Sequence, residues 1–80
     1  MKNEIDLEDF EKLVQELIEQ QKKIMLKTAK KIVPQVVSDD LMQPNDFIEL
    51  EKNALFRYEE GVLAGIQTLQ MAIRAIQKSS

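Results

Sequence analysis

The sequence predicts an all-α fold, an antiparallel two-helix hairpin with a Pro-containing connection, which we expect to dimerise into a four-helix bundle. Two observations lead to this prediction. First, the second half of the chain carries an apolar residue at every seventh position, with no Pro among them: Ile48, Leu55, Val62, Leu69 and Ile76. Second, the 80-residue chain has neither Cys nor His, so disulfides and thiolate or imidazole metal sites are excluded. Oligomerisation is then the remaining support for a small core.

The first helix is expected over about residues 6–33. Asp6 has the side chain of an N-cap, and acidic residues in the first turns complement the helix dipole. Apolar residues then follow helical spacing, which predicts one buried stripe. Pro34 lacks a main-chain donor and ends the helix. The stripe residues are Leu7, Phe10, Leu13, Val14, Leu17, Ile18, Ile24, Met25, Ala29 and Ile32.

A connection over about residues 34–45 and a second helix over about 46–77 complete a single domain, residues 1–80. The connection is rich in turn and capping residues such as Ser38 and Asp39. Pro44 and Asn45, followed by Asp46, mark the start of the second helix.

Charge is distributed unevenly along both helices. Acidic residues dominate positions 4–19, whereas lysines follow without an acid from Lys22 to Lys31. The second helix is acidic in its first half and ends with Arg74 and Lys78. An antiparallel hairpin would place opposite charges side by side, including Glu8 and Glu11 near Arg74 and Lys78. The alternative is that each helix only complements its own dipole.

The second helix has an apolar arc of roughly 200°, about twice what one neighbouring helix covers. We therefore expect a homodimer that covers the remainder. The predicted self-association or core seam consists of Ile48, Leu55, Val62, Ile66, Leu69, Ile73 and Ile76. A ladder of small residues beside it predicts close helix packing: Ala54, Gly61, Gly65, Thr68 and Ala75.

Gly61 and Gly65 should each cost a helix interior about 1 kcal/mol relative to Ala. Close approach of another helix would explain them. A kink or a small pocket beside Tyr58 and Glu59 is the alternative.

Phe56 and Leu63 fall on the arc that otherwise carries charged and polar residues. Either the connection or the other subunit covers them, or they form a partner-docking site. In the docking case, changing both to polar residues would abolish binding without unfolding the protein.

We expect no catalytic residues, no cofactor and no metal site. Adjacent carboxylates such as Glu59 and Glu60 point apart on a helix, which does not favour acid–base catalysis. The most plausible function is a non-catalytic homo-oligomeric interaction or regulatory module. Alternatives are binding of a small anionic ligand near Arg57 and Tyr58, or weak nucleic-acid contact through Lys22 to Lys31.

The chain is expected to be cytoplasmic, because its apolar stretches are too short to span a bilayer and its acidic beginning is unlike a secretory signal. Its net charge of -3 argues against nucleic acid as the main partner.

The segment Phe56-Arg57-Tyr58-Glu59-Glu60-Gly61-Val62-Leu63-Ala64-Gly65-Ile66, with the Pro-broken hairpin before it, resembles a small all-helical family of Gram-positive bacteria. No activity is assigned to that family. The resemblance implies a bacterial cytoplasmic setting and adds no mechanism.

Overall fold

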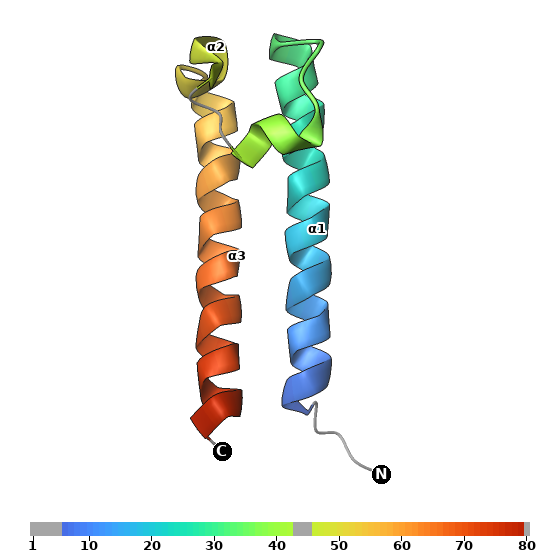
Figure 1. Cartoon of the computed structure of the whole chain (residues 1–80), viewed down its shortest axis with the longest axis vertical. Helices are drawn as coiled ribbons and strands as arrows, with labels where there is room; N and C mark the ends of the chain where they lie inside the picture. Colours follow the sequence, from blue (N-terminus) through green and yellow to red (C-terminus); the bar gives the residue numbers. More distant parts are fainter. Residues whose placement is uncertain (1–5, 43–45, 80) are drawn as a thin grey trace.

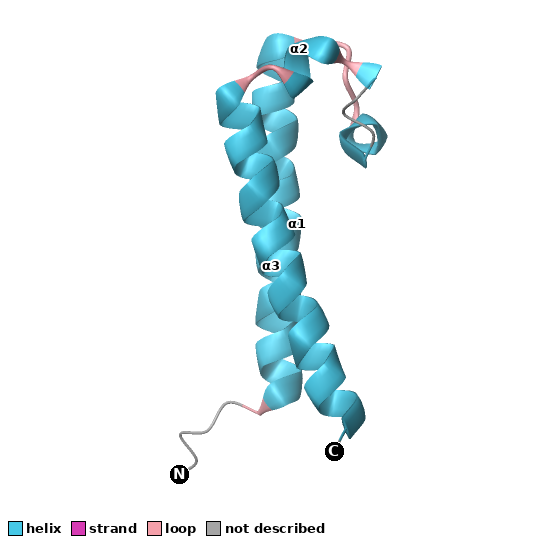
Figure 2. Ribbon diagram, turned by 90° about the vertical axis from the view of Figure 1, so that its left-hand side faces the viewer, coloured by secondary structure: helices cyan, strands magenta, loops and turns pink. Residues whose placement is uncertain are grey.

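The chain folds into two long helices that pack antiparallel, as predicted (Figure 1). The computed structural model describes residues 6–42 and 46–79. Helix α1 spans Leu7–Ile32 and helix α3 spans Ala54–Ser79. A 3-10 helix, η1, spans Ser38–Met42, and a short helix, α2, spans Ile48–Glu51. The connection between α1 and α3 projects to one side of the hairpin (Figure 2).

Helix α1 begins and ends where its sequence dictates. The Asp6 carboxylate Oδ1 accepts a hydrogen bond from the Asp9 N–H at 3.0 Å, which satisfies a donor that the helix itself leaves unpaired. At the other end, the Val33 N–H donates to the Ala29 carbonyl at 2.7 Å, and Pro34 follows. These ends lie within one residue of the predicted range.

Polar side chains hold the connection against α1 through hydrogen bonds to the backbone of the connection. Lys30 Nζ donates to the Val36 carbonyl at 2.8 Å, and the Val36 side chain is buried. The Val37 N–H donates to Asp40 Oδ2 at 2.9 Å, which fixes the turn into η1. Pro44 and Asn45, predicted to mark the second helix start, lie outside the described residues.

The sequence predicted one continuous second helix over about residues 46–77. The structure instead has two helices, because the helix is interrupted between α2 and α3. Asn53 Oδ1 accepts from the Phe56 N–H at 2.9 Å, and the Asn53 carbonyl accepts from the Arg57 N–H at 3.0 Å. This is the hydrogen-bond pattern of an Asn N-cap, so a new helix starts at Ala54. Because α2 is a separate helix, Ile48 does not continue the face of α3 that carries Leu55.

The core consists of two apolar clusters along the α1–α3 contact, and half-buried Leu63 packs against both. The cluster near the connection contains buried Met25, Ala29, Val33, Val36, Leu50 and Phe56. The cluster near the open end contains buried Val14, Ile18 and Ile73.

The predicted self-association or core seam belongs only in part to this core. Ile73 is buried, and Val62 and Ile66 are half-buried. The exposed members are Ile48, Leu55, Leu69 and Ile76. The face that α3 turns toward α1 instead mixes Phe56 and Ile73 with two polar residues, Glu59 and Gln70, which are buried. This face is not the most apolar one of α3, because Glu59 and Gln70 form hydrogen bonds with residues of α1.

Replacing Phe56 by Ala should lower the free energy of unfolding by about 3 kcal/mol or more, because the whole aromatic side chain is buried (0% exposed). For a hairpin of this size, such a loss would leave much of the chain unfolded at 25 °C. Urea unfolding followed by circular dichroism measures it.

The matched control is Met71→Ala on the same helix. The Met71 side chain is 63% exposed, so its removal should change stability by less than about 0.5 kcal/mol. Equal effects of the two substitutions would contradict the placement of Phe56.

Candidate interaction face

One broad side of the hairpin carries large apolar residues that are exposed in the part of the chain that the structure describes. On α1, counting about 100° per residue, the buried residues centre near Ile18 and Met25, and an exposed apolar stripe lies roughly 80° to one side of them. On α3, an apolar ladder lies at the same angular offset from the buried residues. We call these residues the open face: Phe10, Leu13, Leu17 and Ile24 of α1, with Leu55, Tyr58, Val62, Leu69 and Ile76 of α3.

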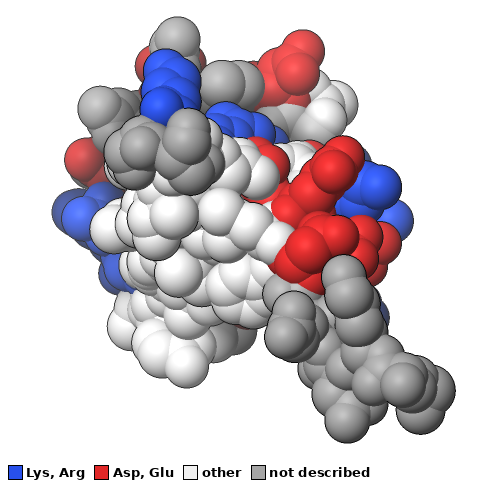
Figure 3. All heavy atoms as spheres, turned by 90° about the horizontal axis from the view of Figure 1, so that it is seen from below, with Lys and Arg blue, Asp and Glu red and all other residues white. Residues whose placement is uncertain are grey.

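The two stripes lie on the same side of the hairpin because the helices are antiparallel. Both helices are right-handed, but seen from one end of the hairpin the residue numbers increase clockwise around one helix and anticlockwise around the other. Equal angular offsets from the α1–α3 contact therefore lie on the same side of the hairpin. The space-filling view from below, onto the open end of the hairpin, shows a continuous area without Lys, Arg, Asp or Glu (Figure 3). The open face is therefore one surface and not two separate strips.

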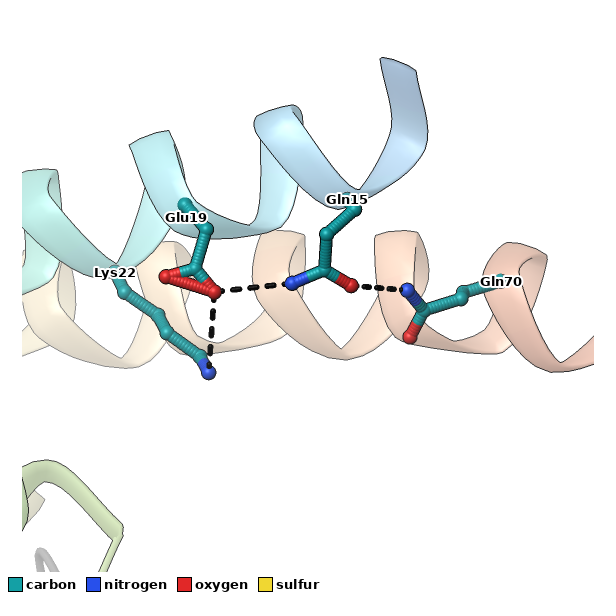
Figure 4. A network of polar contacts seen from close by, with 4 residues as sticks. All are labelled: Gln15, Glu19, Lys22 and Gln70. Atoms are coloured by element: carbon teal, nitrogen blue, oxygen red, sulfur yellow. Dashed lines mark hydrogen bonds and ion pairs between the residues drawn. The ribbon is translucent and has the colours of Figure 1, made fainter. Parts of the chain in front are cut away.

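The opposite edge of the α1–α3 contact is polar. Arg74 Nε donates to Glu11 Oε1 at 2.7 Å, as the charge pattern predicted. Gln70 Nε2 donates to Gln15 Oε1 at 2.5 Å, and Gln15 Nε2 donates to Glu19 Oε1 at 3.0 Å (Figure 4).

Lys22 Nζ lies 3.9 Å from the same Glu19 oxygen, so the chain of polar contacts continues along α1 (Figure 4). Of these contacts, Arg74 with Glu11 and Gln70 with Gln15 join α3 to α1 on this side. They leave the other side to apolar residues.

The small-residue ladder is exposed within the chain, which contradicts close packing between α1 and α3 at these positions. The side chains or Cα atoms of Ala54, Gly61, Gly65, Thr68 and Ala75 all face outward. A Cβ built on Gly61 or Gly65 would have no heavy atom of the described structure within 4 Å beyond its own helix backbone. The ladder borders the open face along α3, so any close packing would have to involve another molecule.

The proposed docking pair is buried inside the hairpin, which corrects that hypothesis. Phe56 is fully buried, and Leu63 is half-buried between the two core clusters. The connection and α1 cover them, which was the alternative considered for these residues. Neither side chain is available as an exposed anchor.

A buried carboxylate lies in the α1–α3 contact. Glu59 is only 8% exposed, and its Oε2 accepts from the Thr28 hydroxyl at 2.9 Å. Among the described residues, its Oε1 has no hydrogen-bond partner. The Glu59 carbonyl accepts from Gln21 Nε2 at 3.0 Å, so this turn of α3 is held to α1 by two side chains.

Arg57 and Tyr58, near which the sequence allowed an anionic ligand, are both exposed. Arg57 forms an ion pair with Glu60, with Nε 3.6 Å from Oε1, and Tyr58 is 69% exposed. A pocket of about 600 Å³ lies between α1, η1 and α3, but neither Arg57 nor Tyr58 lines it. Its polar rim carries both signs of charge, from Lys22 and Lys23 and from Glu19, Asp39 and Glu60.

Within the part of the chain that the structure describes, no three acidic side chains come together as metal ligands. The same residues include no helix that is long and apolar enough to cross a membrane. The lysines from Lys22 to Lys31 are exposed on α1, although Lys22 and Lys30 make the contacts given above.

Comparison of the chain with models of protein families, with curated proteins and with solved structures finds no match. The fold defines the class: a small all-helical protein, built as an antiparallel hairpin, for which no family is identified. The likeness of residues 56–66 to a Gram-positive family stays a prediction.

Replacing Thr28 by Val should lower the free energy of unfolding by about 1–3 kcal/mol, because it removes the hydrogen bond to a buried carboxylate while keeping the shape. Chemical denaturation measures the loss. Thr68→Val is the control, since exposed Thr68 donates only to the Ala64 carbonyl of its own helix. If Thr28→Val were as stable as the wild type, the Thr28–Glu59 hydrogen bond would contribute nothing to the free energy of unfolding.

The Glu11–Arg74 contact should make stability depend on pH. The hydrogen bond from Arg74 holds the pKa of Glu11 below its ordinary value of 4.5 in the folded protein. The contact therefore stabilises above about pH 4.5, and this contribution is lost as pH falls through the folded-state pKa. Glu11→Gln should thus be less stable than the wild type at pH 7.

The stability gap between wild type and Glu11→Gln should close in acid, as thermal unfolding between pH 7 and pH 3 would show. Glu8→Gln, an exposed carboxylate in the same region of α1, serves as the control. A gap that stayed constant across this range would rule out an ionised Glu11 as its cause.

Proposed function

We propose that this protein is a non-catalytic interaction module that self-associates through the open face. The observation that supports the proposal most directly is that both long helices carry large exposed apolar residues on the same side of the hairpin. Monomeric proteins rarely expose apolar patches of more than a few hundred Å². Two hairpins packed face to face would form a four-helix bundle, in which neighbouring helices lie about 20° from antiparallel.

The size of the open face suits a stable dimer. Each long helix has 26 residues and is about 39 Å long, and two packed helices are roughly 20 Å wide. One side of the hairpin is therefore on the order of 800 Å², which is about what each partner contributes to a standard protein–protein interface.

The shape of the single chain also supports the proposal. Its radius of gyration is 15.6 Å, whereas a compact domain of this length has about 12 Å. Its surface area is 6134 Å², compared with about 5,000 Å² for a compact monomer of this mass. An elongated two-helix layer with one open side accounts for both differences.

Light scattering across a dilution series, with helicity recorded at each concentration, tests the proposal. We expect a mass of twice 9.3 kDa at high concentration and a loss of helix as the dimer dissociates. A fully helical monomer at every concentration would overturn self-association.

A matched pair of variants tests the face itself. Leu69→Glu would bury a charge in the dimer and should raise its dissociation constant on the order of tenfold or more. Met71→Glu places the same charge two residues along α3, on an exposed side chain that points away from the open face, and should leave the dimer intact. Equal effects of the two would show that association uses another surface.

A further inference from the structure

We infer that the two copies pack with α1 antiparallel to α1 of the second copy, and α3 antiparallel to α3. This inference rests on the proposed self-association and adds its geometry. The open face would then be occupied by a second copy of this chain, related by a dyad that lies in the interface and crosses the helices at right angles.

Two dyads can bring the open faces together. A dyad across the helices stacks α1 on α1, whereas a dyad along the helices stacks α1 on α3 of the second copy. Both produce a bundle in which all neighbouring helices are antiparallel, so the fold alone does not choose between them. The side chains that border the open face do.

The outer edge of the open face on α1 is charged and divided into two halves. Asp9 and Glu16 lie along its first half, and Lys27 and Lys31 along its second half, all of them exposed. Their positions place them roughly 150° from the buried stripe, next to Leu13 and the other apolar residues of the open face. An acidic half and a basic half on one edge are self-complementary when the edge meets a reversed copy of itself.

With the dyad across the helices, Asp9 lies near Lys27 and Lys31 of the second copy, and the dyad repeats the contact. With the dyad along the helices, the same edge of α1 meets the outer edge of α3, which carries no charge over residues 61–76 apart from Arg74. Arg74 lies on the other side of α3, where it contacts Glu11. The charges of α1 would then have no counterparts, so complementarity favours the dyad across the helices.

The outer edge of α3 is suited to contact with itself. Its residues Gly61, Gly65, Thr68 and Ala72 are small and exposed, and the two glycines have open space where a Cβ would stand. Each glycine costs the helix about 1 kcal/mol relative to Ala, and nothing inside the hairpin needs its small size. Close approach of α3 to a reversed α3 would use the small residues of both copies together.

The middle of α1 identifies the position where the two copies should meet. Leu7–Ile32 has its midpoint near Gln20, which is exposed on the outer edge of the open face. A dyad through this point brings Gln20 close to Gln20 of the second copy. With the alternative dyad, Gln20 lies instead at the height of Gly65 of the second copy, with Thr68 about one helical turn further along α3.

Disulfide trapping tests the inference, because the native chain has no Cys. Three single-Cys variants are oxidised under mild conditions and examined on non-reducing gels: Gln20→Cys, Thr68→Cys and Met71→Cys. We expect Gln20→Cys, oxidised without a second variant, to give mostly covalent dimer. We expect Met71→Cys to stay monomeric on the gel. Light scattering in reductant checks that each variant still self-associates.

The outcomes separate the inference from the function it rests on. If Gln20→Cys fails to cross-link alone, while a mixture with Thr68→Cys gives a mixed dimer, self-association stands and the α1-on-α1 arrangement is overturned. If the wild type is a monomer throughout, the proposed function fails first.

Charge reversal gives an independent readout of the same geometry. Lys27→Glu with Lys31→Glu should raise the dissociation constant about five- to tenfold, since the dyad doubles each weak surface pair. Adding Asp9→Lys to that variant should recover part of the lost affinity. An Asp9→Lys change that weakens association further would contradict the antiparallel pairing of α1 with α1.

Discussion

A helix can turn only one part of its surface toward a single neighbour, and this constraint shapes the whole molecule. Both α1 and α3 have apolar arcs wider than one neighbour covers, so the hairpin buries part of each arc and leaves the rest in water. The 3-10 helix η1 of the connection lies on the opposite side, where it forms a pocket with both long helices. The open face is the part of both apolar arcs that the contact between the two helices leaves exposed.

The polar contacts of the α1–α3 boundary decide which part of each arc is buried. Glu11 with Arg74 and Gln15 with Gln70 lie along one edge, and Glu59 is buried against Thr28. Each of these contacts is weak or moderate alone, and the carboxylate of Glu59 is not fully satisfied. Together with Phe56 and Ile73, they fix the rotation of α3 about its axis. That rotation turns Leu55, Leu69 and Ile76 outward.

The break at Asn53 adds a second constraint on this rotation. Because a new helix starts at Ala54, the preceding turn can direct Leu50 into the core while α3 presents Phe56 to the same cluster. A continuous helix would place these two residues, six positions apart, at about 120° from one another. The cap therefore allows both to be buried, and it separates Ile48 from the ladder that its sequence spacing suggests.

The sequence alone determined the helical class and the end of α1 before Pro34, because spacing and capping are local signals. Its charge order favoured the antiparallel direction and placed Glu8 and Glu11 near Arg74 and Lys78, of which the structure forms the Glu11–Arg74 contact. The sequence also indicated that α3 has more apolar surface than one neighbour needs. It could not assign Leu55 to the outside and Phe56 to the inside, since periodicity measures how apolar a face is and not which neighbour it meets. Only the tertiary structure decided that, through the cap at Asn53 and through polar partners, such as Thr28 for Glu59 and Gln15 for Gln70, that are 31 and 55 residues apart.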